Sequence, residues 1–574
     1  MPYVLGLGGP YRHDASACLV DETGQIVAFA EEERFSRRRW SAGTRKTSRS
    51  VSFCLDRAGI GLADVDDIVA GFVPRWLDGP AIRHRRLIRQ TLEPRYFDGH
   101  QPVEVSVIGH HLAHAASAFH CSGFDRAAVL VVDGAGDGAA TSLYRGTPDG
   151  LELVEDYPFN QSLGLLYESA AGYLGLGDLG GADKLMALAA YGEPRYDLGF
   201  LTETASGYAI DLSKYGMGPR DTGGFRHVTP DWSRRMKECC RAAYAALGVP
   251  ERTSWLSYDR ASGGFSRCDD FTPEQADLAA SMQAALERCL LSLARRALAA
   301  SGTTRLCLAG DVALNCAANG VLQRYSGATE LFVQPAADDA GIAIGAALEV
   351  ARQRGYATIP SRRMTHIAFG PDFSDEGIGR VLDETGARYT HHGDAVVEAA
   401  ATALADGSVI GWFQGRAEGG PRALGRRSIL GDPRSVTTRD RMNRDIKRRE
   451  WWRPLGLSVH ADAAGDLVLT PSPGSTDFMA VAHYATETAR TRAPAAVHVD
   501  DTLRPQVVTA AADDRYARLL HAFGARTGVL ALVNASFNDE SEPIVCSPAD
   551  ALRMFWSSPM DALAIGGFWL DKRR

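Results

Sequence analysis

His110-His111-Leu112-Ala113-His114 and the later stretch Val131-Val132-Asp133-Gly134 contain the residues around which the rest of the chain is organised. His110 and His114 stand four positions apart in an alanine-rich segment that favours helix, so both imidazoles lie on one helix face. Asp133 ends an apolar segment and precedes glycine, which places it where a predicted strand meets a turn. Two imidazoles and a carboxylate suit a divalent transition metal such as Fe(II) or Zn(II). Histidines at this spacing also occur on helix surfaces and in cores, so a metal site requires Asp133 to fold against them.

The composition is that of an ordinary globular protein of roughly two or three domains. Of its 574 residues, 45% are hydrophobic and 23% are charged, and the net charge of −8 argues against a protein that binds nucleic acid or a membrane surface. We expect no secretion signal and no membrane span, because the sequence has neither a basic and apolar leader nor a long apolar run. Its ten cysteines include no Cys-x-x-Cys pair, which favours a reduced, cytoplasmic setting.

The N-terminal region contains two similar units of strand, glycine-rich turn and strand. In the first, predicted strands at 3–7 and 17–20 flank a turn that contains His13, a candidate base or ligand. In the second, the strand that leads to Asp133 is followed by glycines and by a predicted strand over 139–144. Such turns can bind phosphates or be plain hairpin turns, and their repetition hints at the duplicated architecture of actin-like ATPases.

Charged and irregular segments leave several alternatives open. The run 31–39 changes from acidic to basic, as either a solvated face or a site where arginines capture an anion. Lys184 begins a predicted helix and can meet a phosphate or remain a surface lysine. Residues 195–270 are rich in glycine, arginine and aromatic residues, which indicates an irregular insertion or a substrate lid. A long amphipathic helix is predicted over 275–300.

The C-terminal region is marked by basic residues. Beyond a predicted linker between residues 354 and 375, a glycine-rich basic stretch covers 415–428, and seven further basic side chains lie in 439–453. In an acidic protein, this concentration predicts one strongly anionic small ligand, with a nucleic-acid patch as the alternative. The apolar segment 529–533 is a predicted strand, and the polar residues 534–538 are expected to form the loop that closes it.

Short motifs follow one another along almost the whole chain, and their order makes them specific. They are His13-Asp14-Ala15-Ser16, Glu31 to Arg37, His110 to Ser117, Val132-Asp133-Gly134, Lys184-Leu185-Met186, Val312-Ala313-Leu314-Asn315, Gly420-Pro421-Arg422-Ala423-Leu424-Gly425, Arg449 to Pro454 and Asn534 to Asn538. Together they resemble the carbamoyltransferase family of antibiotic and nodulation-factor biosynthesis, which includes the tobramycin, cephem and ansamycin O-carbamoyltransferases.

The resemblance implies an α/β protein with two domains. Residues 1–358 would form an actin-like ATPase domain, similar to the Kae-type protein that transfers threonylcarbamoyl to tRNA, and residues 372–574 would form a YrdC-like domain. In such enzymes the C-terminal domain converts carbamoyl phosphate and ATP to carbamoyl-adenylate. The N-terminal domain passes the carbamoyl group to a hydroxyl of a small molecule, here an antibiotic-type natural product, and releases AMP. Neither nucleic acid nor membrane is an expected partner.

The resemblance also assigns the site, residue by residue. The metal ligands would be His110, His114, Asp133 and Asp339, with Asp338 as the alternative to Asp339. Iron, as Fe(II), is the expected ion, and magnesium or zinc are the alternatives. The catalytic residues would be His13, Lys447 and Arg449. Contacts to the nucleotide and carbamoyl-adenylate would come from Arg39, Ser162, Gly175, Gly310, Asn315, Arg422, Arg427, Arg453, Arg504, Asn534, Ser536 and Asn538.

Arg39 stands where the family commonly has lysine, and two further departures from the family pattern matter for the nucleotide site. Asp311 replaces a glycine before Val312-Ala313-Leu314-Asn315, and Asp183 replaces a glycine before Lys184-Leu185-Met186. A carboxylate repels a phosphate unless it contacts sugar, metal or the acceptor, so both replacements bear on the nucleotide contact. Neither changes a predicted metal ligand. The acceptor pocket is expected to be shaped by the regions 74–95 and 192–270, which match no motif.

Other functions remain as alternatives. A fused enzyme of tRNA threonylcarbamoylation would act on a different acceptor, and the net charge and the lack of a basic N-terminal arm argue against it. A related hydrogenase-maturation enzyme would carry an acylphosphatase domain and Cys-x-x-Cys zinc fingers, and the sequence contains neither. A degenerate ATP-binding regulator is supported by Asp183 and Asp311 alone, whereas His13 and the intact set of metal ligands favour an enzyme.

Overall fold

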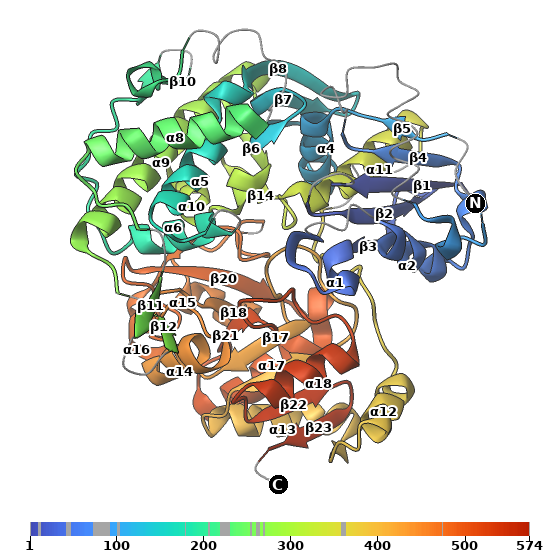
Figure 1. Cartoon of the computed structure of the whole chain (residues 1–574). Coiled ribbons are helices and arrows are strands. Elements are labelled where there is room, and N and C mark those ends of the chain that lie inside the picture. Colours follow the sequence, from blue (N-terminus) through green and yellow to red (C-terminus); the bar gives the residue numbers. More distant parts are fainter. Residues whose placement is uncertain are drawn as a thin grey trace.

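The computed structural model of the chain is an α/β protein, as the sequence predicts (Figure 1). Within the described residues, two five-stranded sheets and one nine-stranded sheet form the framework. No helix in these residues is both long enough and apolar enough to cross a membrane. The structure describes residues 2–9, 13–41, 47–72, 92–99, 104–177, 180–204, 207–218, 230–252, 255–259, 264–267, 270–356, 363–472 and 474–572.

The first sheet has the strand order β3-β2-β1-β4-β5. Side chains of β1 alternate between two cores, because Val4 packs in the core that contains α11 (Ile342–Gln353), whereas Leu5 and Leu7 pack with α2 (Ser48–Ala58). A sheet buried on both faces explains why its central strand is apolar throughout. The strands are β1 (Tyr3–Gly8), β2 (Ser16–Asp21), β3 (Ile26–Glu31), β4 (Asp67–Ala70) and β5 (Ser106–Val107).

The second sheet, in the order β14-β13-β6-β7-β8, repeats the topology of the first. Each sheet consists of three antiparallel strands in sequence, followed by two strands that run parallel to the first of them. The duplication confirms the actin-like architecture that the two strand–turn–strand units indicated. The strands are β6 (Ala127–Gly136), β7 (Ala139–Thr147), β8 (Gly150–Pro158), β13 (Arg305–Ala309) and β14 (Glu330–Val333).

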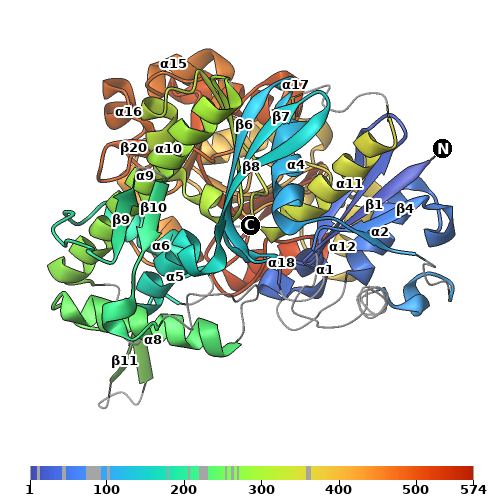
Figure 2. The same cartoon turned by 90° about the horizontal axis from the view of Figure 1, so that it is seen from above.

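Two equivalent helices, α4 (His110–Ser122) and α11, come after the last strand of each sheet and pack side by side (Figure 2). Their approach is close, because a Cβ atom at Gly345 of α11 would lie 1.8 Å from the carbonyl oxygen of Ala113 in α4. Glycine at this position therefore lets the helices meet. Both begin at the same end of the pair, which is where the candidate metal ligands lie.

Residues 195–270 contain regular structure, which corrects the prediction of an irregular segment. Helix α8 (Pro230–Ala246) buries Cys240 and Tyr244 four residues apart, so that one helix face packs on α5 (Leu163–Tyr173). Charged residues elsewhere in the helix, among them Arg234, Arg235, Lys237 and Glu238, obscured the pattern in the sequence. The same region forms two hairpins, β9 (Leu201–Thr204) with β10 (Gly207–Ile210), and β11 (Leu256–Asp259) with β12 (Gly264–Arg267).

Helix α9 (Pro273–Ser301) confirms the predicted long helix. It begins with a capping box formed by Thr272 and Gln275 and ends at Gly302, whose φ is +63°. The helix lies between the second sheet on one side and α5 and α6 on the other. The neighbouring helices are α6 (Gly181–Ala189) and α10 (Cys316–Tyr325).

The C-terminal part is built on the nine-stranded sheet, in the order β15-β23-β22-β16-β17-β21-β18-β20-β19. Asn534 and Ser536 belong to β21 and pair with its neighbours, which corrects the prediction of a polar loop at these residues. The YrdC-like classification and the boundaries at residues 358 and 372 remain predictions. The strands are β15 (Thr390–His391), β16 (Ile410–Phe413), β17 (Arg427–Gly431), β18 (Gly456–His460), β19 (His483–Tyr484), β20 (Thr502–Val508), β21 (Ala531–Ser536), β22 (Ala562–Ile565) and β23 (Phe568–Asp571).

Helices cover this large sheet, and Figure 1 shows them below the two smaller sheets. The main core between helices and sheet includes the fully buried Trp412 of β16 and Tyr516 of α17. The helices are α12 (Asp375–Glu384), α13 (Val396–Ala405), α14 (Val436–Arg441), α15 (Ala464–Leu467), α16 (Glu487–Arg492), α17 (Ala510–Thr527) and α18 (Pro548–Ser557).

The run of charges at the end of β3 joins the N- and C-terminal parts. Arg34 donates to the carbonyl oxygen of Gly420 at 2.7 Å, and the Gly420 amide donates to Glu31 Oε1 at 2.6 Å. Arg37 donates to the carbonyl oxygen of Ile544, also at 2.7 Å. Glu31 and Arg34 are buried. These residues form neither a solvated face nor a free anion site, because their charges are used to connect two parts of the molecule.

Candidate metal and anion site

The four candidate metal ligands come from three segments that meet at the centre of the duplicated fold. His110 and His114 lie in the first turns of α4. Asp133 follows Val132 in β6, where the pairing with β7 loses its register. Asp339 opens the short turn that leads into α11. One ligand atom from each of the four lies within 4.8 Å of the others, so the structure assembles a group that is widely separated in the sequence.

The polar atoms of this cluster do not fully satisfy one another by hydrogen bonds, but together they could bind a cation. His110 Nε2 lies 3.0 Å from Asp133 Oδ2 and 3.3 Å from Asp339 Oδ1, and His114 Nε2 lies 3.4 Å from that same Asp339 oxygen. Nevertheless, His114 Nε2 and Asp339 Oδ1 are buried and lack a hydrogen-bond partner. Unpaired buried polar atoms are costly, whereas imidazole and carboxylate donors together suit a divalent transition metal. The residues present therefore fit such an ion.

Charge interactions within the cluster oppose the effect of burial. Burial disfavours the charged form of His110, but the charge of Asp339 and the hydrogen bond with Asp133 outweigh it and raise the pKa of His110 to about 9. Burial also disfavours ionised Asp133, but the hydrogen bond with His110 outweighs it and lowers the pKa of Asp133. The carboxylates of the cluster are thus held in the ionised form that binds metal.

His13 lies at the accessible edge of the cluster, with 31% of its side chain exposed. Its Nδ1 is 2.7 Å from Asp14 Oδ2 and 3.9 Å from Asp339 Oδ2. Burial disfavours imidazolium, but the hydrogen bond to Asp14 and the charge of Asp339 outweigh it and raise the pKa of His13 to about 10. A cation bound at Asp339 would weaken the effect of this carboxylate and lower the pKa of His13. A lower pKa is needed if His13 is to accept a proton.

Ser162 and Asn315, predicted to contact the nucleotide, are the caps of two helices. Ser162 Oγ accepts from the amide of Leu165 in α5 and donates to the carbonyl oxygen of Gly134 at 2.6 Å. Asn315 Oδ1 accepts from the amide of Ala318 in α10 at 3.0 Å. Both side chains therefore stabilise the start of a helix, and Ser162 also binds the Asp133 segment. Their contact with a nucleotide remains a prediction.

The two glycines predicted at the nucleotide site adopt conformations that favour glycine. Gly310 has a φ of +88°, and a Cβ atom there would lie 2.3 Å from the carbonyl oxygen of Val132. This position needs glycine because β13 and β6 pack so closely, with or without a ligand. Gly175, just beyond α5, has a φ of +69°, which is typical of the residue that ends a helix.

Four arginines form what we call the arginine cluster: Arg422, Arg453 and Arg504, which were predicted to bind the nucleotide, and Arg449, which was predicted to be catalytic. Burial, followed by the charges of Arg453 and Arg504, lowers the pKa of Arg449 to about 9. Burial, followed by the charge of Arg422, lowers the pKa of Arg504 to about 10. Arg504 Nε is buried and has no hydrogen-bond partner. Holding like charges together in a buried place costs free energy that a bound anion would recover.

Lys447 lies in the same region and is almost fully buried. Its Nζ is 2.6 Å from the carbonyl oxygen of Ser536 and 3.0 Å from Ser536 Oγ. It is also 2.5 Å from the carbonyl oxygen of Asn538 and 2.7 Å from Asn538 Oδ1. Burial lowers the pKa of Lys447 well below its usual value, and the neighbouring Arg449 lowers it further. Three residues that the sequence assigned to one site, Lys447, Ser536 and Asn538, are therefore in direct contact.

Arg39 and Asn534 also border this region. Arg39 donates to the carbonyl oxygen of Glu540 at 2.7 Å, and its guanidinium lies 4.3 Å from the ring centre of Trp40. Arg39 thus reaches from the N-terminal part to a loop of the C-terminal part. Asn534 Nδ2 donates to the carbonyl oxygen of Ala423 at 3.1 Å, whereas its Oδ1 is buried without a hydrogen-bond partner. That oxygen is a buried acceptor, and its contact with a ligand remains a prediction.

Arg427, whose contact with the nucleotide remains a prediction, is used in the protein's own main-chain contacts. It is fully buried, and its guanidinium donates at 3.0 Å to the carbonyl oxygens of Gln414, Gly415 and Pro371. The guanidinium also lies 3.6 Å from the ring centre of Phe413. These contacts assign Arg427 to holding the loop after β16 in place.

The two aspartates that replace family glycines each have a defined partner. Asp183 Oδ1 lies 3.1 Å from Arg422 NH2, so this carboxylate pairs with a member of the arginine cluster. The main-chain amide of Asp311 donates to Asp133 Oδ1 at 3.2 Å and helps to fix a metal ligand. Burial, followed by the charges of Asp133 and Asp339, raises the pKa of the Asp311 carboxyl group. The charge of an ion bound by the cluster would therefore act on the Asp311 carboxyl group.

Sequence reasoning missed the carboxylates that balance the arginine cluster. Glu450 is buried, and its Oε2 lies 3.9 Å from Arg453 NH1. Its other oxygen lies 3.0 Å from Lys184 Nζ, which also contacts Glu540 at 2.5 Å. Lys184 is therefore neither a surface lysine nor placed only for phosphate, because it bridges two acids of the C-terminal part. The available signal was the place of Glu450 between the basic residues of 447–449 and Arg453.

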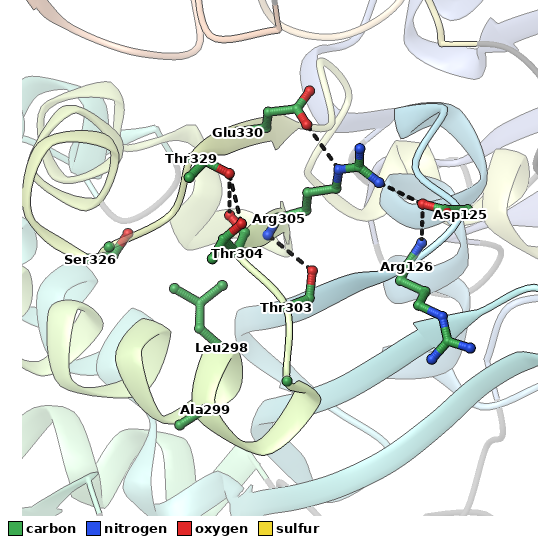
Figure 3. Close-up of a pocket in the computed structure, with 12 residues that line it drawn as sticks. Asp125, Arg126, Leu298, Ala299, Thr303, Thr304, Arg305, Ser326, Thr329 and Glu330 are labelled. Carbon is green, nitrogen blue, oxygen red and sulfur yellow. Dashed lines mark hydrogen bonds and ion pairs between the residues drawn. The ribbon is translucent and has the colours of Figure 1, made fainter.

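A surface hollow lies away from these residues, at the start of β13 (Figure 3). Its central charge, Arg305, contacts Asp125 at 2.5 Å and Glu330 at 2.8 Å. Gly310 follows the other end of β13, so this strand separates the hollow from the metal ligands. We assign no function to this hollow, because the arginine in it is already paired.

Comparison with known proteins places the chain in a family. The model described as "Carbamoyltransferase N-terminus" matches residues 3–79 and 90–348, and the model described as "Carbamoyltransferase C-terminus" matches residues 401–572. Nodulation protein NolNO of Sinorhizobium fredii is 36% identical over 99% of this chain and 80% of its own length. The 3'-hydroxymethylcephem-O-carbamoyltransferase of Amycolatopsis lactamdurans is 29% identical over 46% of this chain and 49% of its own length.

Among solved structures, the HypF protein of T. kodakarensis is similar with a TM-score of 0.32 at 15% identity, over 63% of this chain and 49% of that one. Component A of (R)-2-hydroxyglutaryl-CoA dehydratase from Acidaminococcus fermentans also has a TM-score of 0.32, at 14% identity, over 62% of this chain and 99% of its own length. The family models match most of the sequence, including every candidate metal ligand and every member of the arginine cluster. The chain therefore belongs to the carbamoyltransferase family and is a transferase enzyme.

Proposed function

We propose that this enzyme is an ATP-dependent O-carbamoyltransferase that makes carbamoyl-adenylate and transfers its carbamoyl group to a hydroxyl of a small natural product. The observation that supports this proposal is the arginine cluster beside Lys447, across an interface from the metal-ligand cluster. The loop of Arg422 lies against the segment that leads to Asp339, since a Cβ atom at Gly420 would lie 2.6 Å from the carbonyl oxygen of Pro335. An anion site and a metal site are thus neighbours in one molecule.

The first half of the reaction joins two anions. Water releases phosphate from carbamoyl phosphate to give carbamate, and a carbamate oxygen then attacks the α-phosphorus of ATP, so that pyrophosphate leaves. Several cations are needed to hold these charges together, which suits the arginine cluster. We assign Lys447 and Arg449 to this half because Lys447 is buried beside the cluster and Arg449 is a buried member of it. We assign the same step to residues 372–574, the predicted YrdC-like domain.

In the second half, the acceptor hydroxyl attacks the carbamoyl carbon, AMP leaves, and the hydroxyl proton passes to a base. His13 is the candidate base, since Asp14 fixes its ring beside the metal-ligand cluster, and such a base contributes about a hundredfold or more. A divalent metal held by His110, His114 and the two aspartates would supply Lewis-acid polarisation of the bound adenylate. We propose Fe(II) as the ion, and we assign the transfer step to a domain formed by residues 1–358.

A small alcohol is the proposed acceptor. One relative is named for a hydroxymethylcephem and others are nodulation proteins, which supports a natural product rather than a macromolecule. The net charge of −8 argues against tRNA as the acceptor. We further propose a cytoplasmic location, where ATP and carbamoyl phosphate are formed.

The decisive test is pyrophosphate release by the purified protein with ATP, carbamoyl phosphate and Fe(II), in the absence of any acceptor. We expect release that disappears when carbamoyl phosphate is omitted, after which acceptor alcohols can be screened for carbamoylation. Folded protein that binds ATP but releases no pyrophosphate would favour the ATP-binding regulator instead.

A further inference from the structure

The first turn of α6 crosses from the N-terminal part to the arginine cluster. Its residue Asp183 has Oδ1 3.1 Å and Oδ2 3.4 Å from the two terminal nitrogens of Arg422, which belongs to the loop after β16. The next residue, Lys184, makes the ion pair with Glu450, whose other oxygen faces Arg453. One helical turn therefore presents an anion to one arginine of the cluster and a cation to the acid that balances another.

The Asp183 side chain interacts with the arginine cluster as the carboxylate group of a bound ligand would. Burial disfavours its charged form, but Arg422 and then Arg453 and Arg504 outweigh burial and lower the pKa of Asp183 to about 2. A carboxylate in the first turn of a helix also gains from the helix dipole, so a structural role has to be considered. The dipole does not explain why the carboxylate meets a guanidinium from another part of the chain with both oxygens. About a third of the side chain remains exposed, so the pair is open to competition.

We propose that Asp183 is an internal competitor for Arg422, which holds this arginine until an anionic ligand takes the place of its carboxylate. The inference rests on the proposed anion site and adds the residue that sets its affinity. A phosphate that contacts Arg422 must either break the ion pair or bind next to the repelling Asp183 carboxylate. Both lower the affinity of the site for phosphate. A ligand that contacts several arginines at once gains enough binding free energy to offset this cost. An anion that contacts Arg422 alone gains little binding free energy. Asp183 therefore selects for phosphate chains over single anions.

Inorganic pyrophosphate, titrated calorimetrically into the full-length protein, is the probe for this competition. Asp183→Asn removes the charge and keeps the shape, and Asp183→Gly restores the residue of the family pattern. We expect both variants to bind pyrophosphate about tenfold more tightly than the wild type. Asp394→Asn is the matched control, because Asp394 pairs with Arg515 and Arg518 near the edge strand β15 and should leave binding unchanged.

A second pair of titrations separates competition from general repulsion. In Arg422→Gln protein, the gain from Asp183→Asn should shrink to about twofold, because the contested arginine is gone. An undiminished gain in that background, or no gain in either Asp183 variant while the wild type binds pyrophosphate, would overturn the inference. Failure of the wild type and of every variant to bind pyrophosphate would instead refute the anion site on which the proposed function rests.

Discussion

His114 is fully buried, and neither of its ring nitrogens has a hydrogen-bond partner. An imidazole in this state is destabilising unless something binds it, because a buried polar atom that has lost its water costs free energy. The four-residue spacing to His110 predicted a shared helix face, and Asp133 followed from its place at the end of an apolar segment. Asp339 is far away in sequence, where Asp338 and Asp339 both precede a glycine- and alanine-rich segment that could supply a further carboxylate, and the family resemblance selected Asp339 between the two.

We expect His114→Ala to abolish carbamoyl transfer while leaving pyrophosphate release largely intact, because the metal site and the arginine cluster serve different steps. Metal content, measured by mass spectrometry after dialysis, should fall in parallel. The exposed His521 on α17 provides the control His521→Ala, which should retain metal and transfer. Loss of pyrophosphate release in the His114 variant, with transfer from added adenylate intact, would show that we have assigned the two steps to the wrong parts.

Lys447→Ala should have the opposite effect. The substitution removes a cation beside the arginine cluster and leaves the oxygens of Ser536 and Asn538 unpaired, so pyrophosphate release should fall by about a hundredfold or more. Metal content should remain at the wild-type level. The exposed Lys214 supplies the control Lys214→Ala. Normal pyrophosphate release from folded Lys447→Ala protein would remove this lysine from the first step.

At the scale of elements, the metal site depends on how closely α4 and α11 approach. Both helices carry ligands at or just before their N-terminal ends, and the carbonyl oxygen of Ala113 occupies the space that a side chain at Gly345 would need. Residues that are not themselves ligands therefore fix the distance between the ligands of the metal. Most strands and helices were predictable, because apolar periodicity, caps and glycines mark them locally.

We expect Gly345→Ala to destabilise the protein by about 3 kcal/mol and to weaken metal binding, because α11 must move away from α4. Thermal unfolding and metal titration, here with Co(II) as a spectroscopic probe, would measure the two effects. Gly465 in α15 has open space around it, so Gly465→Ala should be neutral or slightly stabilising. A Gly345→Ala protein with unchanged metal affinity would mean that the helix contact does not set the ligand geometry.

His483 of β19 is expected to make the stability of the protein depend on pH. It is buried, its Nε2 has no hydrogen-bond partner, and burial lowers its pKa to about 4 from the usual 6.5. Between these values the unfolded chain binds a proton and the folded protein does not, so the free energy of unfolding falls as the pH falls, by about 2 kcal/mol at pH 5. His483→Gln should lose less stability than the wild type between about pH 7.5 and 5. The exposed His391→Gln is the control, and an equal loss in all three proteins would exclude His483 as the cause.

At the scale of the whole molecule, the interface between the N- and C-terminal parts was the least predictable feature. The run from Glu31 to Arg37 has the composition of a solvated face, yet its charges are satisfied by Gly420 and by the loop at Ile544. Similarly, nothing near Asp183 in the sequence indicates Arg422. Ion pairs between distant segments follow from tertiary structure alone, because neither partner carries a local pattern for the other.

The same interface predicts that the carbamoyl group passes from one site to the other within a single molecule. A mixed anhydride of carbamate and AMP is readily hydrolysed, so a path closed by the interface protects it from water. We expect a mixture of His114→Ala and Lys447→Ala proteins, each defective in one half-reaction, to show almost no carbamoyl transfer from ATP and carbamoyl phosphate. Wild-type protein diluted to the same total concentration with His114→Ala protein should keep its share of activity, which controls for interference. Recovery of a substantial part of the transfer activity in the first mixture would mean that the adenylate leaves one molecule and reaches the metal site of another.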